Sequence, residues 1–316
     1  MHRTARVDDG GEVRVGFMIG LASAVVLAGV LTFSVWAKAL DPVGFAEQMV
    51  RDGMMPKSLS YLAAITMVGI EAALAFALLA VRRKTTLFAV SVVMAGFFLL
   101  SLYQYFFPAE DPSSCGCFGN LVQQSPGQHA AVNGVFVLLA GLAWLSLRGR
   151  KGKPPAWRWA VPGAGFALGA ALAFAAPHLP VDNLATQLRP GVQVATLRID
   201  EIVPELQSGT TLVLLIDRAD ELTRQEIARV NELVALEPAS QVQVFGLAEV
   251  NEELEIEFLW TAAPAFEIRA AAWGTLKPLY RTLPRSFLVK DGVVDVVWDE
   301  IPDEQTLRRI AGGQYP

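Results

Sequence analysis

Five long apolar segments in the first 180 residues constrain the fold of this chain more than any other feature. They cover approximately residues 15–40, 59–81, 87–107, 130–147 and 159–176. A helix that crosses a hydrocarbon core of about 30 Å needs roughly 20 apolar residues, so these segments are candidates to span a membrane. The fourth segment is the shortest and the fifth is the richest in Gly, Ala and Pro, so either could be tilted or interrupted.

The overall composition agrees with a membrane protein. Apolar residues make up 53% of the chain, charged residues make up 18%, and the mean hydropathy is +0.39, which is too apolar for an ordinary soluble protein. The net charge of -5 gives no electrostatic footprint for nucleic acid, and no basic patch is interleaved with aromatic residues. We therefore expect contact with membrane lipid and no nucleic-acid partner.

The basic residues predict the orientation of the segments. Lys and Arg cluster at residues 3–14, 82–84 and 148–158, and a five-span arrangement places all three clusters on one side. Positive charge marks the cytoplasmic side, so the loop after the third span and everything after the fifth are expected outside. The first apolar run exceeds the 7–15 residues of a cleaved signal peptide, so it should remain as an anchor. The predicted location is a bacterial inner membrane with a cytoplasmic N-terminus.

Two cysteines, Cys115 and Cys117, are separated by Gly116 in the polar loop between the third and fourth segments. They can close only a very small ring, and strained disulfides are easily reduced. On the expected topology the pair faces an oxidising compartment. We therefore predict that it exchanges between dithiol and disulfide, with either sulfur as the attacking thiol. The alternative is a structural clip, whereas a metal site is not expected because zinc normally takes four ligands.

Neighbouring residues are expected to support this pair. Phe118 is interpreted as an apolar plug toward the bilayer, and Gly119 supplies backbone freedom. His129 begins the fourth segment, where an imidazolium or the positive helix end would favour a thiolate. The competing expectation for His129 is a surface residue at the membrane boundary.

Three further polar residues lie in or beside the apolar segments. Glu71 is about 13 residues into the second segment, so its carboxylate should face the interior and be neutral, paired or hydrated. Lys38 lies near the outer end of the first segment and is expected to reach the interface. If Lys38 points inward instead, several helical turns should separate it, or Tyr61, from Glu71, which argues against pairing. Asn133 is expected to hydrogen-bond between helices.

From about residue 189 onward the pattern changes to short strands and amphipathic helices, enough for one domain. A buried strand, a helix and a second strand are predicted at residues 211–216, 220–236 and 242–247, which together form a βαβ unit. Asp291-Gly292 predicts a hairpin between strands at 286–289 and 293–298, and a short helix at 303–310 ends the domain.

This C-terminal segment resembles the thioredoxin-like domains of membrane-anchored thiol-disulfide proteins, a family that includes the cytochrome c maturation proteins. The resemblance rests on the strand at 212–216, on Glu226, and on the run 283–289 that contains Pro284. It implies that Pro284 is a cis-proline facing the position of the family dithiol. Asp220 and Thr223 occupy that position here, and neither can exchange thiols. We expect Pro284, Asp220 and Thr223 to face a bound peptide or partner. The alternative is a vestigial domain that is kept for stability.

Residues 15–148 resemble the MauE branch of the DoxX-like membrane proteins. The resemblance rests on Lys38, Asp41, Glu71, Asn133 and the Cys-Gly-Cys-Phe-Gly run at 115–119. It implies a four-helix membrane bundle and a role in maturing methylamine dehydrogenase, a disulfide-rich periplasmic enzyme, alongside a thioredoxin-like companion.

The predicted fold is an α-helical membrane bundle, four DoxX-like helices plus one tethering transmembrane helix, followed by an α/β thioredoxin-like domain that lacks a CxxC motif. The corresponding domains are residues 1–150, 151–188 and 189–316.

The leading functional hypothesis is a membrane-embedded thiol-disulfide component that assists oxidative maturation of extracytoplasmic proteins. Its partners would be extracytoplasmic protein thiols or a separate thioredoxin-like protein, because the fused domain has no cysteines. A quinone in the bundle is a candidate electron acceptor, although no residue identifies one. The rival hypothesis is a non-enzymatic scaffold with a clipped loop and a docking domain. Transport of a small molecule through the bundle is a third hypothesis, which rests on Glu71 alone.

Overall fold

The computed structural model describes residues 9–81, 83–107, 125–147, 155–235 and 242–314. The chain divides into two compact units, Met1–Leu179 and Pro180–Pro316, and each is described by itself.

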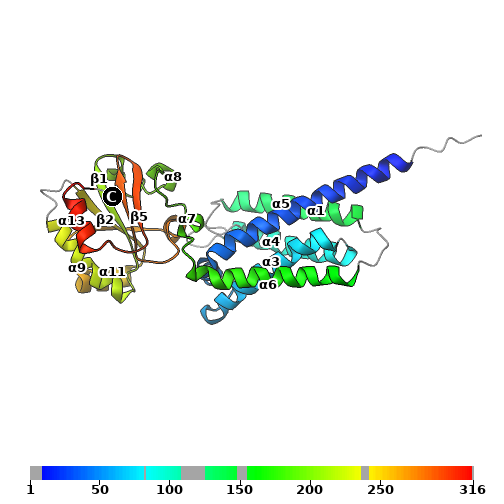
Figure 1. Cartoon of the computed structure of the whole chain (residues 1–316), viewed down its shortest axis with the longest axis horizontal. Coiled ribbons are helices and arrows are strands. Elements are labelled where there is room, and N and C mark those ends of the chain that lie inside the picture. The colour runs from blue at the N-terminus through cyan, green and yellow to red at the C-terminus, as the bar shows by residue number, and fades with distance from the viewer. Residues whose placement is uncertain (1–8, 82, 108–124, 148–154, 236–241, 315–316) are drawn as a thin grey trace, which may run out of the picture. The chain divides into compact units, whose positions relative to one another are not determined.

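The first unit is a bundle of long apolar helices (Figure 1). Its helices are α1 (Asp9–Leu40), α2 (Pro42–Arg51), α3 (Lys57–Ala80), α4 (Lys84–Phe106), α5 (Pro126–Leu147) and α6 (Ala160–Ala175), and α6 has the 3-10 turns η2 (Ala156–Trp159) and η3 (Ala176–His178) at its ends. Five described segments are long and apolar enough to cross a membrane: Arg14–Leu40, Lys57–Ala80, Lys84–Phe106, Pro126–Leu147 and Ala156–His178. The five predicted spans are therefore confirmed as helices, and the fourth and fifth are continuous.

Helix α2 follows α1 directly and was not predicted from the sequence. Asp41 caps it, because its Oδ1 accepts a hydrogen bond from the Gly44 backbone N–H at 2.9 Å. The apolar face of α2 packs on the first half of α3, where Phe45 and Met49 share a buried cluster with Ala64. Helix α2 therefore lies alongside the first part of α3.

Helix α6 packs tightly against α3 through small residues. A Cβ atom at Gly169 would lie 2.7 Å from the Cβ of Ala72, and one at Gly165 would lie 3.0 Å from the Ala72 carbonyl oxygen. Small residues let membrane helices approach closely and gain van der Waals contact. Helix α6 is therefore a packed member of the bundle as well as the connection to the second unit.

The second unit contains a five-stranded sheet in the order β3-β2-β1-β4-β5. The strands are β1 (Thr210–Ile216), β2 (Val242–Glu249), β3 (Glu267–Ala271), β4 (Arg285–Lys290) and β5 (Val293–Trp298). Strands β1, β2 and β3 are parallel, while β4 is antiparallel to β1 and to β5. The predicted βαβ unit and hairpin are confirmed, whereas β3 was not predicted.

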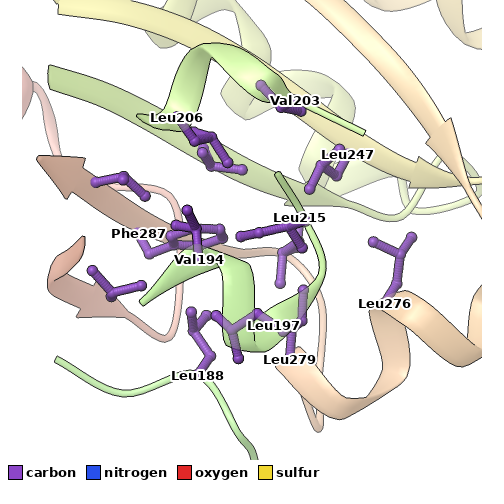
Figure 2. Close-up of a cluster of buried hydrophobic side chains, with 14 of the residues drawn as sticks. Leu188, Val194, Leu197, Val203, Leu206, Leu215, Leu247, Leu276, Leu279 and Phe287 are labelled. Atoms are coloured by element: carbon purple, nitrogen blue, oxygen red, sulfur yellow. The ribbon is translucent and has the colours of Figure 1, made fainter. Parts of the chain in front are cut away.

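Side chains that alternate along β1 build a core on each face of the sheet. Leu212, Leu214 and Ile216 face α9 (Glu221–Ala235), α11 (Glu252–Ala262) and α13 (Glu304–Ala311). Val213 and Leu215 face the other core, which is shown in Figure 2. This second core is covered by α8 (Val194–Leu197), η4 (Pro204–Gln207), α12 (Trp273–Leu276) and η5 (Lys277–Leu279), and α7 (Asp182–Ala185) precedes them in the chain.

Candidate functional site

A buried ion pair joins Lys38 of α1 to Glu71 of α3 inside the bundle. Lys38 Nζ donates to Glu71 Oε1, and the two side chains are 2% and 0% exposed. The same ammonium donates to Ser34 Oγ at 3.0 Å. It also lies 5.1 Å and 5.2 Å from the ring centres of Phe45 and Phe97, whose faces attract a cation. Lys38 is therefore stabilised by groups from α1, α2, α3 and α4.

Glu71 has fewer partners than Lys38. Its Oε2 atom is buried and accepts no hydrogen bond from the residues that the structure describes. A buried acceptor without a donor costs free energy, so stability alone does not account for a carboxylate at this position. Such an atom can accept a hydrogen bond from a donor, and we place the centre of the candidate site here.

Two expectations for Lys38 are wrong: it does not reach the interface, and no helical turns separate it from Glu71. Helix α2 packs along the start of α3, so Glu71 lies level with Lys38 although it is roughly 20 Å along α3 at 1.5 Å per residue. The predicted inward orientation of Glu71 is confirmed by its complete burial.

A second buried polar group connects α4 and α5. The Ser101 hydroxyl donates to the Phe97 carbonyl oxygen at 2.6 Å, so its oxygen accepts from Asn133 Nδ2 at 3.0 Å. Asn133 Nδ2 also lies 3.1 Å from His129 Nε2. Because that amide nitrogen can only donate, Nε2 of His129 accepts and carries no proton. The interhelical bond expected for Asn133 is present.

His129 does not occupy the surface position that was expected for a boundary residue. Its side chain is 3% exposed. The hydrogen bond from Asn133 favours a neutral ring, in place of the imidazolium considered from the sequence. Lys38, Glu71, Ser101, His129 and Asn133 therefore form two adjacent polar groups at one end of the bundle.

The same end of the bundle carries a polar contact between α2 and α4. Gln104 Nε2 donates to Asp52 Oδ2 at 3.0 Å, and Asp52 ends α2. Burial raises the pKa of the Asp52 carboxyl to about 6, and the bond from Gln104 only partly opposes this. Within the described part of the chain, no group of three or more His, Cys, Asp or Glu side chains could hold a metal ion.

The predicted exchanging pair, Cys115 and Cys117, lies outside the described residues, together with Gly116, Phe118 and Gly119. The described residues stop at Phe107, after α4, and resume at Ser125, before α5. Both positions are at the end of the bundle that holds His129, because α5 begins at Pro126. The sequence between them thus begins and ends beside the buried polar groups.

In the second unit, the position expected for a dithiol is occupied by a helix cap. Asp220 Oδ2 accepts hydrogen bonds from the backbone N–H of Thr223 at 3.0 Å and from its hydroxyl at 2.9 Å. Thr223 is completely buried, so the expectation that it faces a bound peptide does not fit the structure. Two ion pairs cover this region: Arg218 with Glu255 at 3.2 Å, and Arg224 with Glu257 at 3.0 Å.

The Leu283-Pro284 peptide bond is cis, as the resemblance implied. Leu215 of β1 pairs with Arg285 of β4, so Pro284 lies at the end of the sheet from which the chain continues to Asp220. Arg285 is buried and is held by Thr186 Oγ1 at 2.9 Å and by Asp299. Burial lowers the pKa of its guanidinium, and the Asp299 carboxylate opposes that effect.

Residues 17–146 match the family described as methylamine utilisation protein MauE. This segment is similar to the MauE family. The match contains Lys38, Glu71, His129 and Asn133 as well as the two cysteines, so the candidate site lies wholly within the MauE segment. Helix α6 and the second unit follow it. No match was found among curated proteins.

Solved structures similar to this chain include thioredoxin-like proteins. One is a secreted disulfide oxidoreductase of Mycobacterium tuberculosis homologous to DsbE of E. coli, with 14% identity, a TM-score of 0.31, and coverage of 35% of this chain and 85% of that one. DsbF of MTB has 18% identity, a TM-score of 0.30, and coverage of 35% and 84%. A thioredoxin-like protein of Bacteroides caccae has 12% identity, a TM-score of 0.27, and coverage of 82% and 81%. The thioredoxin-like fold after the MauE segment rests on its strand order and cis-proline.

Proposed function

We propose that this protein is a membrane-embedded thiol-disulfide component that assists the maturation of extracytoplasmic proteins, with Cys115 and Cys117 as the exchanging pair. The MauE segment supports a membrane-associated role in thiol-disulfide chemistry or in maturation of the methylamine-utilisation type. The observation that carries the proposal is the position of the buried polar groups. They lie at the end of the bundle where the cysteine-bearing stretch begins and ends.

In this proposal, one cysteine thiolate attacks a disulfide of a partner protein, and a mixed disulfide forms while a partner thiolate leaves. The second cysteine then resolves the mixed disulfide, so the chain becomes oxidised as the partner becomes reduced. The reverse sequence oxidises a client dithiol. The partner is an extracytoplasmic protein thiol or a separate thioredoxin-like protein, since all cysteines of this chain lie in one loop.

The proposal places the protein in a bacterial inner membrane, with the cysteine loop and the second unit on the outer side. A membrane-impermeant thiol reagent should label the reduced loop in intact cells. Labelling only after lysis would reverse the orientation.

The reduction potential of the Cys115–Cys117 disulfide in the purified full-length protein tests the exchange chemistry. We expect a value above about -300 mV, because inert structural disulfides lie below that value. We also expect Cys117→Ser to accumulate a mixed disulfide through Cys115, or Cys115→Ser to do so through Cys117. Normal maturation of client disulfides by both serine variants would contradict the proposal.

The second candidate function is a non-enzymatic scaffold, and the cap formed by Asp220 and Thr223 favours it. This cap fills the place of a dithiol with groups that do no redox chemistry. A scaffold would hold a client through the second unit, and its loop disulfide would resist mild reductants. The potential measured above separates the two functions.

A further inference from the structure

A surface cavity of about 650 Å³ lies between α2 and the start of α3. Its lining residues are Val43, Ala46, Glu47, Val50, Arg51, Lys57, Ser60 and Tyr61. Val43, Ala46 and Val50 form an apolar side along α2, while Arg51 and Lys57 bring one positive charge from each helix. With Glu47 included, the charged side chains of the lining carry a net charge of +1.

The two cations are unusual for this end of the bundle. In the expected topology the outer connecting segments are residues 41–57 and 107–125, and Arg51 and Lys57 are their only Lys or Arg residues. Short outer loops are generally poor in these residues. Both cations that do occur there line the same cavity, which indicates that their positive charge serves to bind an anionic group in it.

Exposed aromatic side chains indicate the depth of this cavity. Trp36 lies one turn before the end of α1, and Tyr103, Tyr105 and Phe106 lie in the last turn of α4. Trp and Tyr concentrate at the level of the lipid headgroups. Helix α2 follows α1 at this level, so the apolar side of the cavity is suited to the glycerol and upper acyl region of a lipid, with its cations at phosphate depth.

We propose that this cavity binds the phosphate group of an anionic phospholipid between Arg51 and Lys57. The net charge of +1 favours a headgroup of net charge -1 over a zwitterionic one. The bound lipid would join α2 to the start of α3. Because α2 carries Phe45, whose ring lies 5.1 Å from the Lys38 ammonium, the lipid would also hold in place one wall of the buried ion pair. This inference does not depend on thiol exchange by the cysteine loop.

Native mass spectrometry of the full-length protein in mild detergent tests the proposal, with dioleoyl phosphatidylglycerol and dioleoyl phosphatidylcholine added separately. We expect preferential binding of phosphatidylglycerol. Each cation removed should weaken that binding about fivefold, so Arg51→Gln with Lys57→Gln should weaken it about thirtyfold. Lys57→Arg, which keeps the charge, should bind like the original protein.

The matched control is Arg83→Gln with Lys84→Gln, which removes two cations from the other end of the bundle and should leave binding unchanged. Equal binding of phosphatidylglycerol by the Arg51/Lys57 variant and the original protein would overturn the proposal. So would an equal loss in the control, which would indicate non-specific attraction. Displacement of the lipid by millimolar inorganic phosphate would show a site for free phosphate, and would also overturn it.

Discussion

The buried pair of Lys38 and Glu71 makes a quantitative prediction about replacing one charge or both. The two side chains are 2% and 0% exposed, so a single replacement leaves an uncompensated charge in apolar surroundings. Breaking a buried pair in this way costs about 3–5 kcal/mol, whereas replacing both partners with apolar residues of similar size is often nearly neutral. We therefore expect Lys38→Met and Glu71→Met each to destabilise the protein more than the double variant does.

The structure also predicts which single variant is worse. Without Glu71, the Lys38 ammonium keeps the Ser34 hydroxyl and the faces of Phe45 and Phe97. Without Lys38, Glu71 loses the partner of its Oε1 atom, and its Oε2 atom has none within the described structure. A cation–π contact in a desolvated site contributes about 2 kcal/mol, so Lys38→Met should be the more destabilising change by about 1–2 kcal/mol.

The assay is a double-mutant cycle on the free energy of unfolding, measured by SDS titration of the purified protein in mild detergent. We expect a coupling energy of at least about 3 kcal/mol, because the double variant should lie within about 1 kcal/mol of the original protein. The control pair is Glu47→Met and Lys57→Met at the exposed cavity, where each change should cost less than about 1 kcal/mol. Additive losses from Lys38→Met and Glu71→Met would refute the reasoning.

Three further predictions concern other parts of the chain. Burial raises the pKa of Asp52 from 3.8 to about 6, so between these pH values the folded protein binds a proton that the unfolded chain has released. The stability should therefore fall as pH rises from about 4 to 6, by at most about 3 kcal/mol. Asp52→Asn should reduce the difference in melting temperature between pH 4.5 and 7.5, and an unchanged difference would count against this explanation. Gly169→Val should lower the free energy of unfolding in SDS by about 1–3 kcal/mol, because the new Cβ would lie 2.7 Å from that of Ala72. Gly163→Ala places its Cβ in open space and should lower it by less than about 1 kcal/mol. Equal effects would contradict the packing argument. Asp220→Ala should lower the thermal stability of the second unit by about 1 kcal/mol, measured by circular dichroism, since it removes the cap of α9, and a change below about 0.3 kcal/mol would contradict the capping role.

The membrane spans could be predicted from the sequence because hydrocarbon imposes a length and an apolar composition on each helix. Helix α2 was missed because it is short and follows α1 after a single residue, Asp41. That omission led to the wrong relative depth of Lys38 and Glu71, and therefore to the expectation that they do not pair. A better signal was present in Asp41-Pro42, a capping residue followed by proline at the first helical position.

In the second unit, strand β1 was predicted because its continuous apolar run is characteristic of a buried strand, and β2 because a second, mostly apolar run follows the intervening helix. Strand β3 was missed because it lies at the edge of the sheet and contains Glu267 and Arg269, which form an exposed ion pair at 2.8 Å. Helix α11 was also missed. Its only buried large side chain among those described is Phe258, and Ile256 and Trp260 are exposed, so its sequence lacks a clear core-facing stripe.

The contact of α6 with α3 limits how this protein can be divided for experiments. The MauE match stops at residue 146, yet Gly165 and Gly169 lie directly against Ala72, one residue from Glu71. A truncation after Leu147 would keep every residue of the family match and still open the far side of the helix that carries the buried carboxylate. Lipid or detergent would then take the place of α6. Functional studies of the membrane part should therefore retain the chain to His178.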